Sequence, residues 1–251
     1  MVSGLRSAAL RAFERVQASM HHAGVDITAA PFRYRVAHAM RLRGITDILD
    51  VGANTGQFAG TMRRAKVRGR IVSIEPLGAA FDELRARAAG DALWTVERAA
   101  VSARPGLLTI NVSDNSVSSS VLPMLAEHAR VAPSSRYVRT EEVTATTVDE
   151  LVRRHQLVPA STLLKIDVQG HERAVLDGAA ETLSQFGAVQ AELSLVPLYE
   201  GQALLPEMLE RLDAHGFDLW VIESGLTDPI TRRQLQVDGT FFRREEQLDE
   251  G

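Results

Sequence analysis

Short runs of aliphatic residues alternate with amphipathic segments through most of this chain. The aliphatic runs fall at 47–51, 70–76, 93–102, 163–168, 188–194, 217–224 and 239–244. Helical spacing of apolar residues is found between most of them, at 57–66, 78–89, 171–185 and 203–215. Strands that are apolar throughout and are separated by helices are typical of a mostly parallel sheet covered on both faces. The pattern therefore predicts an α/β, doubly wound fold.

Three parts of the chain lie outside this alternation. Helical patterns at 4–21 and 31–43 predict an N-terminal helical cap over residues 1–43. Within the main domain, residues 44–245, the segment 106–146 reads as an extra strand, a serine-rich loop, and then a helix and strand inserted beside the sheet, near the expected active site. The last residues, 246–251, form a charged tail. We expect the helices of the cap either to cover the substrate pocket or to form the face of a homodimer.

Composition narrows the classes of function. The 251 residues carry a net charge of −4, so phosphate backbones and anionic lipids are not attracted and nucleic acid is not expected as a partner. No cysteine is present, which excludes disulfides, thiolate metal sites and a cysteine nucleophile. The first 20 residues lack the pattern of a signal peptide, and no apolar run is long enough for a membrane span. We expect a cytoplasmic protein.

The stretch "DVGANTG" ends the first strand and carries the first candidate site. Gly52 and Gly56 allow a sharp turn and a close approach to a ligand, and Asn54 offers an amide between them. Glu75, 19 positions after Gly56, lies at the end of the next strand, where an acid accepts hydrogen bonds from the ribose of an adenosine cofactor. Alone, the glycine pattern also suits an ordinary β–α turn.

The acid that opens this stretch selects among cofactors. Asp50 would repel a pyrophosphate, but it would attract the amino group or sulfonium of S-adenosylmethionine. The glycines also lack the G-x-G-x-x-G spacing of dinucleotide sites, which disfavours a nicotinamide dehydrogenase. The loop is therefore predicted to hold the amino-acid end of S-adenosylmethionine.

A second constellation lies in "LLKIDVQGHE". Lys165 and Asp167 share a face of a buried strand, where charges need a partner or a function. A Lys–Asp ion pair at the rim of the sheet is the alternative. Glu192 ends the strand expected next to this one, so Asp167 and Glu192 are predicted to converge and could bind Mg²⁺. His171 or Asp167 is the candidate general base, although His171 could equally be a solvated residue at a helix N-terminus.

The serine-rich loop at 113–120 is the last candidate. Its hydroxyls could close over the cofactor or the acceptor, and a flexible surface loop is the other interpretation.

Several of these segments together resemble the FkbM-type S-adenosylmethionine-dependent methyltransferases, over about residues 45–195. The matching segments are "DVGANTG", "SIEP", "AAVS", "SSSVL", "TTVDEL", "LLKIDVQGHERAVLDGA" and "AEL", in the order of the family. The resemblance implies a class I (Rossmann-like) fold with a mostly parallel seven-stranded sheet. It also implies methyl transfer to a hydroxyl, commonly of a sugar, glycolipid or macrolide-like product. Polysaccharide precursors, including methylated mannose oligosaccharides, are among the acceptors that it suggests.

The resemblance also implies roles for individual residues. Gly52, Asn54 and Gly56 would contact the methionine moiety and Glu75 the ribose, with Ala100 and Val101 near the adenine. His171 departs from the family pattern, because an aromatic residue usually stands there in sugar-directed relatives; the departure leaves the identity of the acceptor open.

Together, these observations predict metal-assisted O-methylation of a sugar, with Lys165, Asp167 and His171 as the catalytic candidates. Methylation of a lipid or a small natural product is the alternative. An inactive cofactor-binding module would lack the ionisable groups at the acceptor end, and this chain retains them.

Overall fold

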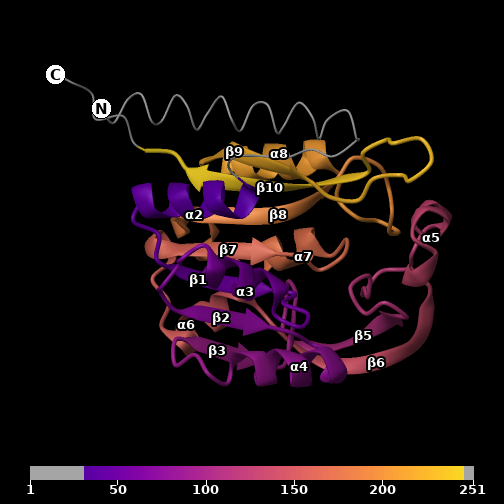
Figure 1. Ribbon diagram of the computed structural model, residues 1–251, viewed down its shortest axis with the longest axis horizontal. Coiled ribbons are helices and arrows are strands. Elements are labelled where there is room, and N and C mark those ends of the chain that lie inside the picture. Colours follow the sequence, from indigo (N-terminus) through magenta and orange to yellow (C-terminus); the bar gives the residue numbers. More distant parts are fainter. Residues whose placement is uncertain (1–30, 246–251) are drawn as a thin grey trace, which may run out of the picture.

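The computed structural model describes residues 31–245, and its centre is a seven-stranded sheet in the order β3-β2-β1-β7-β8-β10-β9 (Figure 1). The strands are β1 (Asp47–Val51), β2 (Ile71–Ile74), β3 (Trp94–Glu97), β7 (Thr162–Ile166), β8 (Ala188–Ser194), β9 (Phe217–Ser224) and β10 (Gln236–Arg243). Neighbours from β3 to β8 are parallel, and β10 is antiparallel to both β8 and β9. The predicted mostly parallel seven-stranded α/β fold is confirmed.

Helices cover both faces of this sheet (Figure 1). One layer contains α2 (Phe32–Leu42), α3 (Gln57–Arg64) and α4 (Gly78–Ala88), and the other contains α6 (Val148–His155), α7 (Glu172–Asp177) and α8 (Leu205–Ala214). Side chains alternate along a strand, so Ile48 packs with the first layer and Leu49 with the second. Because helices cover both faces, every position of the central strands β1 and β7 is buried.

A second, three-stranded sheet lies beside the carboxyl ends of the parallel strands (Figure 1). It has the order β4-β6-β5. Its elements are β4 (Ala100–Val101), β5 (Gly106–Ser113) and β6 (Tyr137–Thr146), with α5 (Ala126–Val131) between the last two. The segment predicted as an insertion, 106–146, holds β5, α5 and β6. It borders the carboxyl ends of the parallel strands, where ligands bind in open α/β folds.

Two predicted elements are interrupted in the structure. The strand expected at 93–102 is divided, because β3 pairs in the main sheet and β4 pairs with β6 in the second sheet. The helix expected at 171–185 is interrupted after α7, where Gly178 lies against the carbonyl of Ser102 and leaves no room for a side chain. Only a short 3₁₀ turn, Leu183–Gln185, follows it. Apolar spacing alone shows neither event, because both depend on which segment lies opposite.

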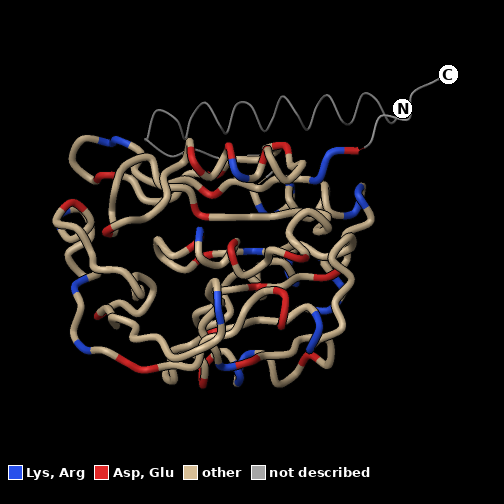
Figure 2. Tube along the Cα trace, turned by 180° about the vertical axis from the view of Figure 1, so that it is seen from behind, with Lys and Arg blue, Asp and Glu red and all other residues tan. Residues whose placement is uncertain are grey.

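The expected N-terminal cap is described in part. Its second helix corresponds to α2, whereas the helix predicted at 4–21 and the tail at 246–251 lie outside the described residues. Along the described part of the chain, basic and acidic residues are interspersed and form no large block of one sign (Figure 2).

Candidate active site

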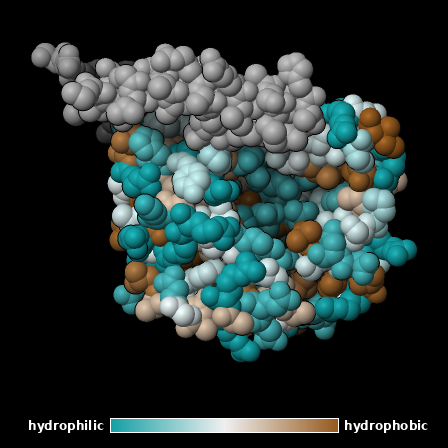
Figure 3. Space-filling view, viewed as in Figure 1, coloured by the Kyte–Doolittle hydropathy of each residue, from teal (hydrophilic) through white to brown (hydrophobic). Residues whose placement is uncertain are grey.

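A cavity of about 320 Å³ opens where the parallel strands end. Its walls come from the turns after β1, β2 and β7, from β4, and from the serine loop after β5. The face shown in Figure 3 is hollowed in this region, with mostly hydrophilic residues around the hollow. Eight of the predicted site residues line the cavity: Gly52, Asn54, Glu75, Ala100, Val101, Lys165, Asp167 and His171.

Gly52 shapes the turn at the centre of the cavity. Its φ is +74°, and a Cβ there would lie 1.8 Å from the backbone oxygen of Asp167. The turns after β1 and β7 therefore touch through a position that only glycine can occupy. Lys165 strengthens this contact by donating a hydrogen bond from Nζ to the Gly52 oxygen, at 3.1 Å.

The other glycine of the motif has a packing role. Gly56 precedes α3 in the left-handed region, with φ +82°. A Cβ would lie 2.9 Å from a methyl group of Leu84 and 3.0 Å from the ring of Trp94. Gly56 lets α3 pack on α4 and is not among the residues that line the cavity.

Glu75 sits at the cavity wall with both carboxylate oxygens engaged. Oε2 accepts from the amide of Asn54 at 2.8 Å, and Oε1 accepts from the amide of Leu77 at 2.9 Å. Burial raises the pKa of Glu75 to about 7, although these two hydrogen bonds oppose the increase. Each oxygen keeps further acceptor capacity, which ribose hydroxyls would use.

The raised pKa predicts that cofactor affinity depends on pH. Below about pH 7 the Glu75 carboxyl takes up a proton and loses acceptor capacity. We expect the affinity for S-adenosylhomocysteine, measured by calorimetry from pH 8 to pH 5.5, to fall by up to about tenfold per pH unit below pH 7. The Glu75→Gln variant should bind S-adenosylhomocysteine weakly, with an affinity that does not change with pH. Glu83 is exposed on α4, so Glu83→Gln should show the same pH dependence as the native protein. A flat native profile would contradict the assignment.

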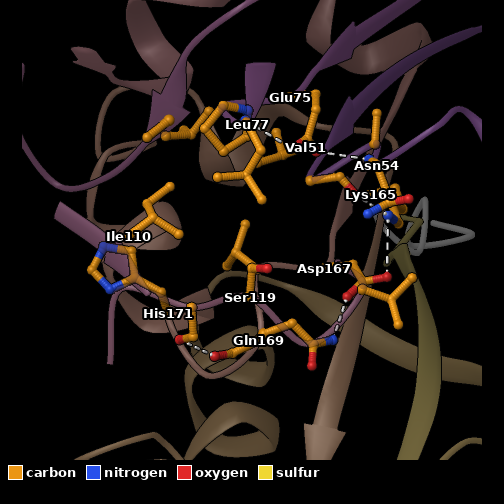
Figure 4. Close-up of a pocket in the computed structure, with 18 of the residues that line it drawn as sticks. Val51, Asn54, Glu75, Leu77, Ile110, Ser119, Lys165, Asp167, Gln169 and His171 are labelled. Atoms are coloured by element: carbon orange, nitrogen blue, oxygen red, sulfur yellow. Dashed lines mark hydrogen bonds and ion pairs between the residues drawn. The ribbon is translucent and has the colours of Figure 1, made fainter. Parts of the chain in front are cut away.

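One end of the cavity is largely apolar and holds His171. Ala100, Val101 and Ile110 line this end, and His171 Nε2 lies 3.0 Å from the hydroxyl of Ser102. In Figure 4 His171 and Ile110 lie on one side of the cavity, and Lys165 and Asn54 lie on the other. Burial lowers the pKa of His171, so the ring is neutral at pH 7.

Asp50 lies beneath the cavity and does not line it. Its carboxylate is fully buried, 3.3 Å from Lys165 Nζ, and it accepts from the Ser73 hydroxyl at 3.1 Å. Burial by itself would lower the pKa of Lys165, but attraction to Asp167 and Asp50 outweighs it and leaves the pKa above its usual range. Lys165 is therefore an ammonium held between two carboxylates.

At the end opposite His171, one amide contacts two carboxylates: that of Asp167, which lines the cavity, and that of Glu192, which is not among the residues that line it. Gln169 Nε2 donates to Asp167 Oδ1 at 2.9 Å and to Glu192 Oε2 at 3.2 Å. Tyr199 orients this amide by donating to Gln169 Oε1 at 2.8 Å. Burial, together with repulsion from Asp167, raises the pKa of Glu192 well above its usual range. Asp167 is the more accessible of the two, with 39% of its side chain exposed.

The serine loop is tied to the body of the protein. Ser120 donates to the backbone oxygen of Gln169 at 2.6 Å, and Ser118 shares a 2.8 Å hydrogen bond with Ser135. Ser116, Ser119 and Ser120 line the cavity. The loop thus forms a wall of the site.

Sequence reasoning assigned no role to three polar residues of the site: Gln169, Gln190 and Asp238. Gln190 and Asp238 also line the cavity, and Gln169 links the two predicted acids. Gln190 could have been found, because it lies two residues before Glu192 on the same face of β8. Asp238 was missed because the last strand was predicted to begin at 239, whereas β10 begins at Gln236.

A family model for the FkbM methyltransferase domain matches residues 50–219, more than half of the chain. This chain belongs to the FkbM methyltransferase family. The match confirms the predicted S-adenosylmethionine-dependent methyltransferase. The sugar acceptor, the transfer to oxygen and the metal are taken up below as proposals.

Solved structures with a related arrangement are distant in sequence. The methyltransferase FkbM of Methylobacillus flagellatus KT is 14% identical, with a TM-score of 0.44 over 78% of this chain and 44% of that one. This chain thus spans less than half of the length of that protein. The 1,6-didemethyltoxoflavin-N1-methyltransferase of Burkholderia thailandensis, with bound S-adenosylhomocysteine, is 14% identical, with a TM-score of 0.44 over 96% and 89%. An rRNA methylase of Streptococcus thermophilus is 9% identical, with a TM-score of 0.46 over 88% and 100%. No curated protein sequence matches the chain.

Within residues 31–245, no helix combines the length and the apolar character that crossing a membrane requires.

Proposed function

We propose that this methyltransferase moves a methyl group from S-adenosylmethionine to a hydroxyl of a sugar or oligosaccharide, such as a polysaccharide precursor, with the help of a divalent cation. The observation that carries the proposal is that Asp167, which lines the cavity, and Glu192 converge on the amide of Gln169. An acceptor hydroxyl must lose a proton as it is methylated, and carboxylates serve both proton removal and cation binding.

The residues of the cavity fit S-adenosylmethionine. The turn at Gly52 and Asn54 would hold the methionine end, and the Glu75 carboxylate would accept hydrogen bonds from the ribose hydroxyls. The apolar end at Ala100, Val101 and Ile110 suits an adenine ring. When bound, the cofactor supplies a methyl group on a positively charged sulfur.

Asp167 is the residue to which we assign the proton of the acceptor hydroxyl. Its carboxylate lines the cavity and is accessible, and Gln169 and Lys165 hold it in place at 2.9 and 3.4 Å. Lys165 keeps its own proton because its pKa is raised, so it acts as a positioning residue. His171, neutral and bonded to Ser102 at the apolar end, is assigned to the adenine side and not to proton removal.

Asp167 and Glu192 are also the residues that would hold a cation such as Mg²⁺. Their oxygens lie within reach of one amide nitrogen, and hard divalent cations prefer carboxylate oxygens, with water completing the shell. Among residues 31–245, no group of three or more histidines, aspartates or glutamates is arranged to hold a metal. When bound, the ion would polarise the acceptor hydroxyl and lower its pKa.

The test is methyl transfer from S-adenosylmethionine to a panel of mono- and oligosaccharides, with and without EDTA. We expect transfer to a neutral sugar that is lost on chelation and restored by Mg²⁺. If EDTA does not change the rate of transfer, the reaction needs no cation, and Asp167 acts as the base alone. Transfer to a lipid or natural-product hydroxyl but to no sugar would establish the alternative acceptor, and cofactor binding without any transfer would indicate an inactive module.

A further inference from the structure

A second cavity of about 280 Å³ adjoins the cofactor cavity on the α2–α3 side of the sheet. The two cavities share four lining residues: Gln57, Phe58, Gln190 and Asp238. Beyond this common wall, the second cavity is bordered by the start of α2, with Arg33, and by β9, with Glu223. A molecule seated here would face the end of the cofactor cavity that holds Lys165 and Asp167.

Strand pairing brings several carboxylates side by side across β8, β10 and β9, next to the second cavity. Asp238 on β10 lies opposite Glu192 on β8 and opposite Glu223 on β9. Register partners in a sheet direct their side chains to the same face. The acids therefore continue the line begun by Asp167, from the cofactor cavity into the second cavity.

A buried amide supplies independent support for a ligand. Gln190 is only 4% exposed, lines both cavities, and its Oε1 is buried without a hydrogen-bond partner among the residues that the structure describes. An unsatisfied buried polar group costs about 1–3 kcal/mol, so such groups call for a partner. A hydroxyl of a bound molecule at the junction of the cavities would provide one.

Charge and shape restrict what that molecule can be. Glu223 and Asp238 offer acceptors for hydroxyl groups, and they would repel a phosphate or a carboxylate. The described lining residues include one cation, Arg33, whose buried Nε has no partner among the described residues, against the two carboxylates of Glu223 and Asp238. Lys165 in the adjoining cavity already lies between two carboxylates. Phe58 presents an aromatic ring against which the apolar face of a sugar ring can pack.

We propose that the second cavity is the acceptor pocket and that it takes an uncharged pyranose ring, with hydroxyls bound by Gln190, Asp238 and Glu223. The proposal rests on the proposed function for the identity of the reaction, but it makes its own claim about binding. Sugars that carry a phosphate or a carboxylate on the ring to be methylated are excluded. The start of α2 then borders the acceptor.

The test measures binding and transfer separately. Neutral methyl pyranosides of the gluco, manno and galacto series, and the 6-phosphates of the same sugars, are titrated by calorimetry and saturation-transfer NMR into protein saturated with S-adenosylhomocysteine. The same compounds are then offered as acceptors with S-adenosylmethionine. We expect at least one neutral pyranoside to bind, and its phosphate to bind at least about tenfold more weakly.

Two variants assign the binding to this cavity. Glu223→Gln should raise the Kd or KM for the neutral sugar about fivefold or more, with kcat and the Kd for S-adenosylhomocysteine unchanged. Gln190→Leu should also raise the Kd or KM for the neutral sugar, without a loss of thermal stability, because it replaces an amide whose buried oxygen is unsatisfied by an apolar group of similar size. Glu210→Gln, exposed on α8 over the opposite face, is the control and should match the native protein.

Each outcome separates the two proposals. If pyranosides bind and both variants weaken this binding, but no methyl group is transferred, the assignment of the acceptor pocket is supported and the proposed reaction is wrong. The assignment of the acceptor pocket is wrong if Glu223→Gln and Gln190→Leu leave methyl transfer at the native level. It is also wrong if the sugar phosphates bind more strongly than the neutral sugars. Absence of both binding and transfer across the panel would overturn both.

Discussion

Asp167→Asn should lower kcat for methyl transfer by about 10²- to 10⁴-fold, the range that a general base contributes. Asparagine keeps the size of the side chain, but it can neither take up the acceptor proton nor bind a cation strongly. The Kd for S-adenosylhomocysteine should change by no more than about threefold, because the cofactor contacts that we assign lie at Gly52, Asn54 and Glu75. Steady-state kinetics and calorimetry on the same preparation measure both quantities.

A matched control is available on α4. Asp82→Asn changes an exposed aspartate that pairs with Arg85, and we expect native kcat from it. If Asp167→Asn keeps more than about a tenth of the native kcat, the proton passes to another group and the assignment of this carboxylate is wrong. Loss of cofactor binding along with kcat would instead indicate that the turn after β7 has collapsed.

Gly52→Ala should abolish cofactor binding and lower the free energy of unfolding by more than about 3 kcal/mol. Two costs combine at this position. A left-handed backbone, with φ +74°, costs a non-glycine residue about 1–2 kcal/mol. In addition, the new Cβ would lie 1.8 Å from the backbone oxygen of Asp167, which must move and take the turn after β7 with it. Denaturant unfolding and calorimetry with S-adenosylhomocysteine test the two parts.

Gly44 separates these two costs. Its φ is +67°, but nothing lies within 4 Å of a Cβ built there. Gly44→Ala should therefore cost only the conformational part, about 1–2 kcal/mol, and leave cofactor binding intact. Equal losses of stability in the two variants would show that the contact between the turns contributes nothing.

Much of the fold follows from local pattern. The strands at 47–51, 188–194 and 217–224 have the predicted bounds, because each is a short aliphatic run closed by polar or small residues. What the pattern could not show is where β10 inserts. It lies between β8 and β9 and is antiparallel to both. This position depends on pairing with other strands, and no property of residues 236–243 alone predicts it.

The same distinction holds for the site. Lys165, Asp167 and Glu192 stood out as ionisable residues on apolar strands, and the structure brings them to one end of the sheet. Asp238 reaches the site through the pairing of β10 with β8, so its part in it could not be predicted without the strand order. His171 was predicted as a catalytic residue; the structure shows that it lines the cavity, and its hydrogen bond to Ser102 tells at which end it lies.

The most direct test of the central claim uses S-adenosylmethionine with a ¹³C-labelled methyl group. The protein is incubated with this cofactor, Mg²⁺ and a neutral oligosaccharide, and the product is examined by two-dimensional ¹H–¹³C NMR. The account predicts one new labelled resonance with the chemical shift of a methyl ether, correlated with a sugar ring proton, and an equal amount of S-adenosylhomocysteine. A labelled methyl group on nitrogen or carbon, or a sugar that stays unlabelled while another class of acceptor takes the label, would contradict it.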